Sequence, residues 1–216
     1  MQCSVIVTDV TPLGKGDLLC ATGIDMATGR NVRPQPYFSE RSCVSRGIEP
    51  GAILEMEGDF YGESPFVEDF FMDWLRSVTP SSAAALKKAL EASCRGSLAR
   101  EFQAEIVDHR YIPREQAVRC SLATTRCPRS RLKILPDRHS ADRFLVHVVF
   151  QNANAWLNLP LVQWTWYRAG LKNRADAINE LHARLQRHEE FYVRLCLGRS
   201  PENGKYLLQV GGLYGV

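Results

Sequence analysis

Several classes of protein are excluded by what this sequence of 216 residues lacks. It has no run approaching the roughly 20 apolar residues that a membrane-spanning helix requires. Its first residues, MQCSVIVTDV, have no basic start followed by a long apolar core, so we expect no secretory signal peptide. The seven cysteines are an odd number and are scattered along the chain, which is typical of reduced thiols. These absences predict a cytoplasmic protein that does not enter a membrane.

The sequence also lacks the residue patterns of common catalytic and cofactor sites. Cys120 and Cys127 have no second Cys/His pair at zinc-ligand spacing, so we expect no metal. The segment Gly14-Lys15-Gly16 lacks the upstream glycine and the following Ser/Thr of a phosphate-binding loop. A metal-dependent nuclease needs clustered carboxylates, and the carboxylates of this chain follow no recognised motif. We therefore predict no enzymatic activity and no cofactor.

Net charge is small, at +3, but the charges are unevenly distributed. Residues 49–74 include eight acidic side chains and no basic one, whereas residues 110–138 include eight basic side chains against two acidic ones. Only six of the 27 basic residues are lysine. Arginine favours bidentate contact with phosphate or carboxylate, although a GC-rich genome would enrich it equally well.

Residues 20–34 form the most informative segment and predict a β-hairpin. Gly29 supplies the positive φ that a tight turn needs, and Pro34 lacks an N–H for the strand ladder. Residues in the returning strand alternate between two faces, so at least one of Arg30 and Arg33 would face solvent. Further strands are predicted over residues 3–8 and 51–57, and together these short strands favour a small barrel.

Residues 64–103 are predicted to be helical. Apolar side chains recur at helical spacing over residues 66–78, and a second helix is expected over residues 83–93 after a break and N-cap at 79–82. We expect the boundary between two domains in or just after this region.

Residues 104–216 return to predicted strands, with one amphipathic helix over residues 174–187. The expected strands are 104–109, 117–123, 129–135, 143–150, 155–162, 191–197 and 206–210. The whole order predicts a mostly β fold with α insertions. It comprises part of a barrel over 1–63, a helical linker over 64–103, and a second barrel with one helix over 104–216.

The hairpin from Gly23 to Pro34 resembles the pattern near the N-terminus of bacterial proteins with a dual OB-containing domain. The segments SLATTR (121–126), RFLVHVVF (143–150) and YLLQVGGLY (206–214) are also similar to that family. The resemblance implies two tandem OB-like barrels and nucleic-acid binding. It also implies a place as an accessory subunit in larger bacterial assemblies that process DNA or act in antiviral defence.

OB barrels hold single strands with a cationic groove and exposed aromatic rings on which bases stack. Trp164 and Trp166 would share one face of an extended segment, although both rings could instead fill the core. The arginines could equally be solvated or paired with the acidic segment. The candidate nucleic-acid contacts are Arg30, Arg33, Arg126, Arg129, Arg131, Lys133, Trp164 and Trp166.

The alternative function is that of a protein-interaction subunit. The acidic and aromatic side chains of the predicted helix 66–78 would then dock a basic protein partner. The candidate partner contacts are Phe66, Glu68, Asp69, Phe71 and Asp73. Charge reversal at Arg126, Arg129 and Arg131 distinguishes the two functions, because only nucleic-acid binding depends on those arginines.

Overall fold

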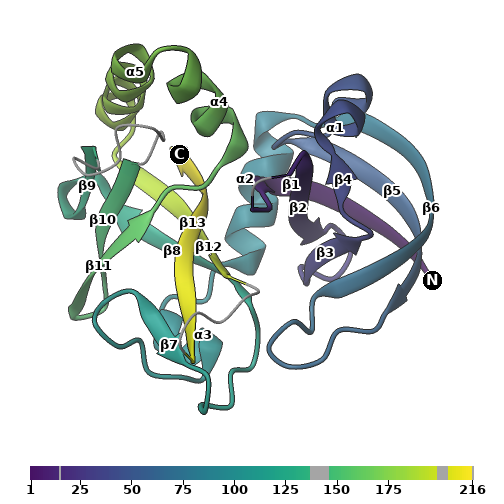
Figure 1. Ribbon diagram of the computed structural model, residues 1–216, viewed down its shortest axis with the longest axis horizontal. Coiled ribbons are helices and arrows are strands. Elements are labelled where there is room, and N and C mark those ends of the chain that lie inside the picture. Colours follow the sequence, from purple (N-terminus) through teal and green to yellow (C-terminus); the bar gives the residue numbers. More distant parts are fainter. Residues whose placement is uncertain (15, 137–145, 199–203, 216) are drawn as a thin grey trace.

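The computed structural model describes residues 1–14, 16–136, 146–198 and 204–215. Residues 2–80 form a closed barrel, here called the N-terminal barrel, which lies at the right of Figure 1. Its strands are β1 (Gln2–Pro12), β2 (Leu18–Asp25), β3 (Asn31–Gln35), β5 (Ala52–Phe60) and β6 (Asp69–Pro80). They pair in the order β1-β2-β3-β6-β5-β1, and β3 with β6 is the parallel pair. A five-stranded barrel of this kind is consistent with an OB-like fold.

The connection between β3 and β5 contains the short strand β4 (Phe38–Ser39) and helix α1 (Glu40–Arg46). Ser39 caps α1 by accepting a hydrogen bond from the Ser42 N–H at 3.1 Å, and Gly47 ends the helix with a φ of 70°. The predicted hairpin is confirmed as β2 and β3, and Gly29 has a φ of 70° in its turn. Pro34 does not end β3, because the strand continues and pairs with β6 on its other side.

The C-terminal half, residues 83–215, contains both strands and helices. Its elements are α2 (Ala83–Ser93), α3 (Leu98–Phe102), β7 (Tyr111–Pro113), β8 (Leu122–Pro128), a 3-10 turn (Arg129–Arg131), β9 (Leu132–Pro136), β10 (Val146–Asn152), β11 (Ala155–Pro160), α4 (Trp164–Lys172), α5 (Arg174–Arg187), β12 (Glu190–Leu197) and β13 (Lys205–Gly215). Two sheets result, with the orders β9-β10-β11 and β8-β12-β13-β7.

These two sheets form an open half-barrel. The 3-10 turn joins β8 directly to β9, so that one continuous segment pairs with β12 at its start and with β10 at its end. An isolated parallel bridge between Leu161 and Val210 links the end of β11 to β13. The half-barrel therefore repeats the strand order of the N-terminal barrel, including its parallel step. Helices α3, α4 and α5 contribute buried side chains such as Phe102, Trp166 and Leu181 to its core.

A buried polar network joins the N-terminal barrel to the C-terminal half. The Arg194 guanidinium is fully buried and donates to Asp9 Oδ2 at 3.0 Å, Asn31 Oδ1 at 2.8 Å and Thr124 Oγ1 at 2.7 Å. Strand β2, next to this network, is buried from Leu19 to Asp25. The outer face of β1–β3 is therefore occupied by the C-terminal half rather than open to solvent.

The prediction of a helix over residues 66–78 is wrong, because these residues lead into and form strand β6. Its register against β5 shifts twice, and each shift inserts one extra residue. The partners of the inward-facing β5 residues are consequently Phe70, Met72, Leu75 and Val78. Their spacing of two, three and three residues imitates helical periodicity. Since β6 closes the N-terminal barrel, residues 69–80 belong to that barrel and not to a helical linker.

Other predicted elements have mixed outcomes. The helices over 83–93 and 174–187 are confirmed with those bounds, and β10 and β11 lie within or close to two predicted strands. The predicted strand over 104–109 is wrong, since this segment contributes only an isolated bridge at Val107. Residues 143–145 of a predicted strand lie outside the described residues. Within the part of the chain that is described, no helix is both long and apolar enough to span a membrane.

Candidate nucleic-acid interface

One face of the sheet β9-β10-β11 points to solvent on the side of the molecule away from the N-terminal barrel (Figure 1). Alternation along the strands buries residues such as Ile134, Val148 and Leu159 and turns their neighbours outward. We call the outward surface the β9–β11 face. Its residues are Lys133, Leu135, His147, Val149, Gln151, Trp156 and Asn158, and exposed Arg131 lies at its edge, at the end of the 3-10 turn that precedes β9.

The register sets cations and an aromatic ring at opposite sides of this face. Lys133 lies opposite Val149, which lies opposite Asn158, and Gln151 lies opposite Trp156. Arg131 and Lys133 are exposed, and 43% of the Trp156 surface is exposed. Lys133 on β9 is thus two strands from β11, which is about 10 Å across the sheet, and Trp156 is offset from it by two residues along β11.

A cavity of about 530 Å³ adjoins the face where β11 approaches β13. Its wall includes Tyr111, His147, Trp156, Asn158 and Lys205. His147 Nδ1 lies 2.8 Å from Asn158 Oδ1, and Nδ1 is the donor because an amide oxygen only accepts. The Lys205 ammonium lies 4.2 Å from the centre of the Tyr111 ring. The cavity therefore combines ring surfaces with hydrogen-bonding groups and a cation.

The charge around the face is predominantly positive. Arg131 and Lys133 lie on the face, and Arg110 and Lys205 lie on the cavity wall. Among the described residues of the face and this wall, Asp108 is the only carboxylate. A polyanion approaching the sheet would meet little like-charge repulsion from these residues.

The predicted basic cluster is divided by the turn between β8 and β9. Arg131 and Lys133 reach the β9–β11 face, but Arg126 lies on β8 and forms an ion pair with Glu190. Arg129 contacts Glu189 at 3.5 Å and donates to Gln186 Oε1 at 2.7 Å. Arg126 and Arg129 are thus engaged by β12 and by residues just before it, away from the face.

The two hairpin arginines also lie elsewhere. The Arg30 guanidinium lies 3.5 Å from the centre of the Phe60 ring and donates to the Val67 carbonyl at 2.8 Å. Arg33 is only 2% exposed, and it donates to Asp69 Oδ1 at 3.1 Å and to Ser121 Oγ at 2.7 Å. The interpretation of Arg33 as a phosphate contact is therefore wrong, because the side chain is sequestered between the two halves.

Trp164 and Trp166 belong to helix α4 rather than to an extended segment. Trp166 is buried in the core of the C-terminal half, and the Arg184 guanidinium lies 4.8 Å from its ring centre. Its proposed role as an exposed stacking ring is therefore wrong. Trp164 is half-buried, packs against the core of the N-terminal barrel and stacks with Tyr167 at 5.8 Å between ring centres.

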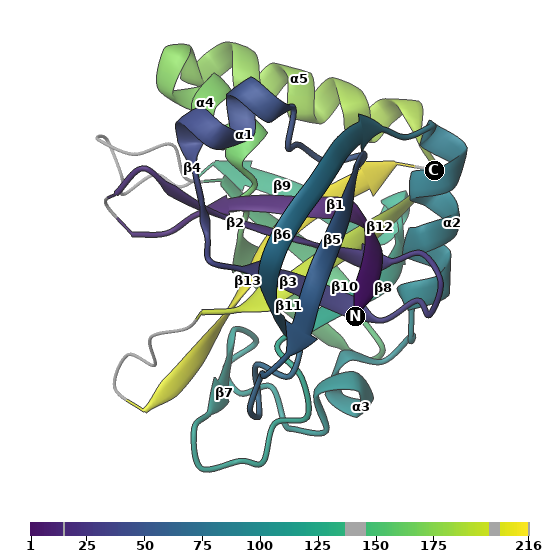
Figure 2. The ribbon, with the colours of Figure 1, turned by 90° about the vertical axis from the view of Figure 1, so that its right-hand side faces the viewer.

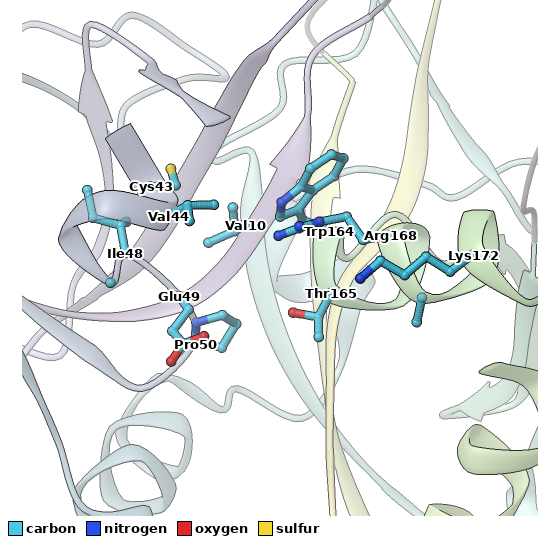
Figure 3. A pocket seen from close by; sticks show the side chains of 12 residues that line it. Val10, Cys43, Val44, Ile48, Glu49, Pro50, Trp164, Thr165, Arg168 and Lys172 are labelled. Atoms are coloured by element: carbon cyan, nitrogen blue, oxygen red, sulfur yellow. The ribbon is translucent and has the colours of Figure 1, made fainter. Parts of the chain in front are cut away.

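Trp164 also lines a second cavity of about 520 Å³ between α1 and α4 (Figure 3). Arg168 and Lys172 extend along one side of this cavity, with Glu49 on the other. Arg168 Nε lies 3.8 Å from Glu40 Oε1. Charges of both signs therefore surround this cavity, in contrast to the β9–β11 face, and it is a weaker phosphate site.

The predicted partner contacts divide in a similar way. Glu68 is buried and accepts hydrogen bonds from the Ser121 N–H and hydroxyl at 2.8 Å, while Asp69 is buried against Arg33. These two assignments as partner contacts are wrong. Phe66 is half-buried against the Tyr206 ring, whereas Phe71 and Asp73 are exposed on β6.

Sequence reasoning missed the residues that complete the face. Trp156 and Asn158 are two residues apart in a correctly predicted strand, so alternation alone placed them on one side of a sheet. His147 was likewise inside a predicted strand. Tyr111 and Lys205 carried no such signal, because they come from β7 and β13 and meet only in the folded chain.

Five of the seven thiols are poor nucleophiles at neutral pH. Burial raises the pKa of Cys3, Cys120 and Cys196 to about 12 and that of Cys43 and Cys127 to about 11. A nucleophilic cysteine requires a lowered pKa instead. Among the described residues, no group of three or more His, Cys, Asp or Glu side chains could hold a metal ion.

Comparison with known proteins adds a likeness among the solved structures. No protein-family model and no curated protein matches this chain. A solved chain described as a murine DNA binding protein bound with double-stranded DNA aligns with 99% of this chain and 96% of its own, at 9% sequence identity and a TM-score of 0.34. A score this low carries no argument about fold detail or function.

Proposed function

We propose that this chain is a non-catalytic nucleic-acid-binding protein that holds a single strand on the β9–β11 face. The observation that carries the proposal is the placement of exposed Trp156 on the same surface as Arg131 and Lys133. Proteins that bind single strands combine a cationic path for the backbone with aromatic rings for the bases. Both components occur here on one sheet.

The spacing across the sheet supports a single strand over a duplex. A sugar–phosphate backbone following β9 would meet Arg131 and Lys133, while its bases would extend across β10 toward Trp156 on β11. Bases in a duplex are stacked and paired internally and would not reach Trp156 without being extruded. An unpaired base has both of its ring faces available for stacking.

The cavity beside Trp156 supports binding of one unstacked base. Its volume of about 530 Å³ lies within the range of roughly 300–1,000 Å³ that is usual for small-molecule sites. The His147 ring and the Asn158 amide offer hydrogen-bonding groups to a base edge, and Lys205 offers a cation to a neighbouring phosphate.

The face of the N-terminal barrel that corresponds to the β9–β11 face is buried. This burial supports placing the nucleic-acid site on the C-terminal half. OB barrels bind oligonucleotides on the face of their second and third strands. In the N-terminal barrel that face includes β2, which is covered by the C-terminal half. The resemblance to the dual OB-containing family supports a role as an accessory subunit of a bacterial assembly acting on DNA or in antiviral defence.

The proposal is tested by fluorescence anisotropy with labelled single-stranded DNA, single-stranded RNA and duplex DNA of matched sequence. We expect the single strands to bind more tightly than the duplex, and affinity to fall between about 50 and 200 mM salt because bound phosphates release counterions. Equal or tighter binding of the duplex would contradict the single-strand assignment. Absence of binding to all three at low salt would contradict nucleic-acid binding itself.

A further inference from the structure

The outer surface of β5 and β6 carries a second concentration of exposed aromatic rings. Figure 2 looks onto these two strands, which lie on the side of the N-terminal barrel away from the C-terminal half. Trp74 is 71% exposed, Tyr61 is 69% exposed and Phe71 is 48% exposed. We call this surface the acidic–aromatic face and define it by Glu57, Asp59, Tyr61, Phe71, Asp73 and Trp74.

The strand register places a carboxylate opposite each exposed ring of β6. Glu57 lies opposite Trp74, and Asp59 lies opposite Phe71. Asp73 is the extra residue at one register shift, and its side chain is exposed. The Tyr61 and Phe71 rings meet edge to face with centres 5.9 Å apart. Rings and carboxylates therefore alternate over one continuous surface.

The acidic–aromatic face carries more carboxylates than there are cations beside it to neutralise them. Arg76 Nη2 contacts Glu57 Oε2 at 2.6 Å, and the N-terminal ammonium lies 3.4 Å from Asp59 Oδ1. Asp73 contributes a further carboxylate. Phosphates would be repelled from such a surface, which distinguishes it from the β9–β11 face.

Rings flanked by carboxylates are suited to bind guanidinium and ammonium groups. A cation over an aromatic ring is stabilised by the ring's electron density, and a carboxylate at the ring edge adds a charge-assisted hydrogen bond. The chain contains an internal instance of the first contact, since the Arg30 guanidinium lies 3.5 Å from the centre of the Phe60 ring on β5.

We propose that the acidic–aromatic face docks a basic segment of a partner protein, with arginine or lysine side chains placed over Trp74 and Phe71 and paired with Glu57, Asp59 and Asp73. The charge complementarity of this surface carries the proposal. This docking role is additional to nucleic-acid binding. The docking surface is a sheet, whereas the sequence predicted a helix at these residues. Because the β9–β11 face lies at the other end of the molecule (Figure 1), both ligands can be bound at once.

The test uses the full chain and two labelled peptides, one of alternating arginine and glycine and one of alternating glutamate and glycine. We expect the arginine peptide alone to bind. Trp74→Ala and Asp73→Lys should each weaken it about fivefold or more, the equivalent of about 1 kcal/mol. Trp156→Ala is the matched control and should leave peptide binding unchanged. Both tryptophans are exposed, so unchanged circular dichroism should accompany each substitution.

Three outcomes would overturn the proposal. In the first, the arginine peptide does not bind, or Trp74→Ala and Asp73→Lys leave its affinity unchanged. In the second, Trp74→Ala weakens labelled single-stranded DNA instead, which would make this face a nucleic-acid site. In the third, sedimentation shows a dimer that Trp74→Ala dissociates, which would make a second copy of the chain the occupant. Each outcome is independent of whether Trp156 binds nucleic acid.

Discussion

Replacing Arg131 and Lys133 together by glutamate is expected to weaken single-stranded nucleic-acid binding by about 10- to 100-fold, or roughly 1.4–2.8 kcal/mol. The substitution removes two phosphate contacts and introduces repulsion on the β9–β11 face. The slope of log affinity against log salt should also become shallower by about 1.4, since each lost contact with a single strand accounts for about 0.7. Anisotropy titrations at several salt concentrations measure both quantities.

The matched control is Arg126→Glu with Arg129→Glu, which makes the same change of charge a few residues earlier. These arginines are engaged with Glu190, Glu189 and Gln186 and lie away from the face. We expect the control pair to change affinity several-fold less than the test pair. A larger loss from the control pair would show that the strand follows β8 and β12, which contradicts the proposed path.

Replacing Arg194 by methionine is expected to destabilise the protein by about 3–5 kcal/mol. The substitution leaves Asp9, which is 3% exposed, as an uncompensated buried carboxylate and removes a donor from Asn31 and Thr124. Urea unfolding followed by circular dichroism measures the loss as a lower midpoint.

Two further variants distinguish the destabilisation caused by breaking the buried network from the effect of removing any arginine. Arg126→Met breaks an exposed ion pair and should cost less than about 1 kcal/mol. Asp9→Leu combined with Arg194→Met removes both charges and should be less destabilised than Arg194→Met alone. If Arg194→Met were as stable as Arg126→Met, the buried network would not hold the two halves together.

Local patterns predicted the elements whose signals are contained in a few adjacent residues. The helix over 83–93 is confirmed because Ser82 caps it, accepting from the Ala85 N–H at 3.1 Å, and because its apolar residues recur at helical spacing. The hairpin at Gly29 is confirmed for a similar reason, since positive φ is set by the turn itself. Strand β6 was mistaken for a helix because its two register shifts depend on pairing with β5.

The candidate site was only partly predictable, since exposure depends on which surfaces meet in the folded chain. Arg131 is exposed at the end of a turn, as expected from the sequence, and Lys133 is exposed on β9, within the strand predicted over residues 129–135. Arg33 has the same local pattern but is buried by contact with Ser121, which is 88 positions away. The pairing of Arg194 with Asp9 spans 185 positions, and neither residue carries a local signal for it.

The binding of a single strand on the β9–β11 face is tested most directly by mapping the crosslinks that bromodeoxyuridine-containing single-stranded DNA forms with the full chain after irradiation. Mass spectrometry of the digested adduct identifies the residues touched by bases. A strand bound on the β9–β11 face should crosslink to Trp156 or to the cavity residues Tyr111 and His147, and these crosslinks should be lost when Arg131 and Lys133 are replaced by glutamate. Crosslinks confined to Trp164 in the cavity between α1 and α4, or to Trp74 on the acidic–aromatic face, would contradict it.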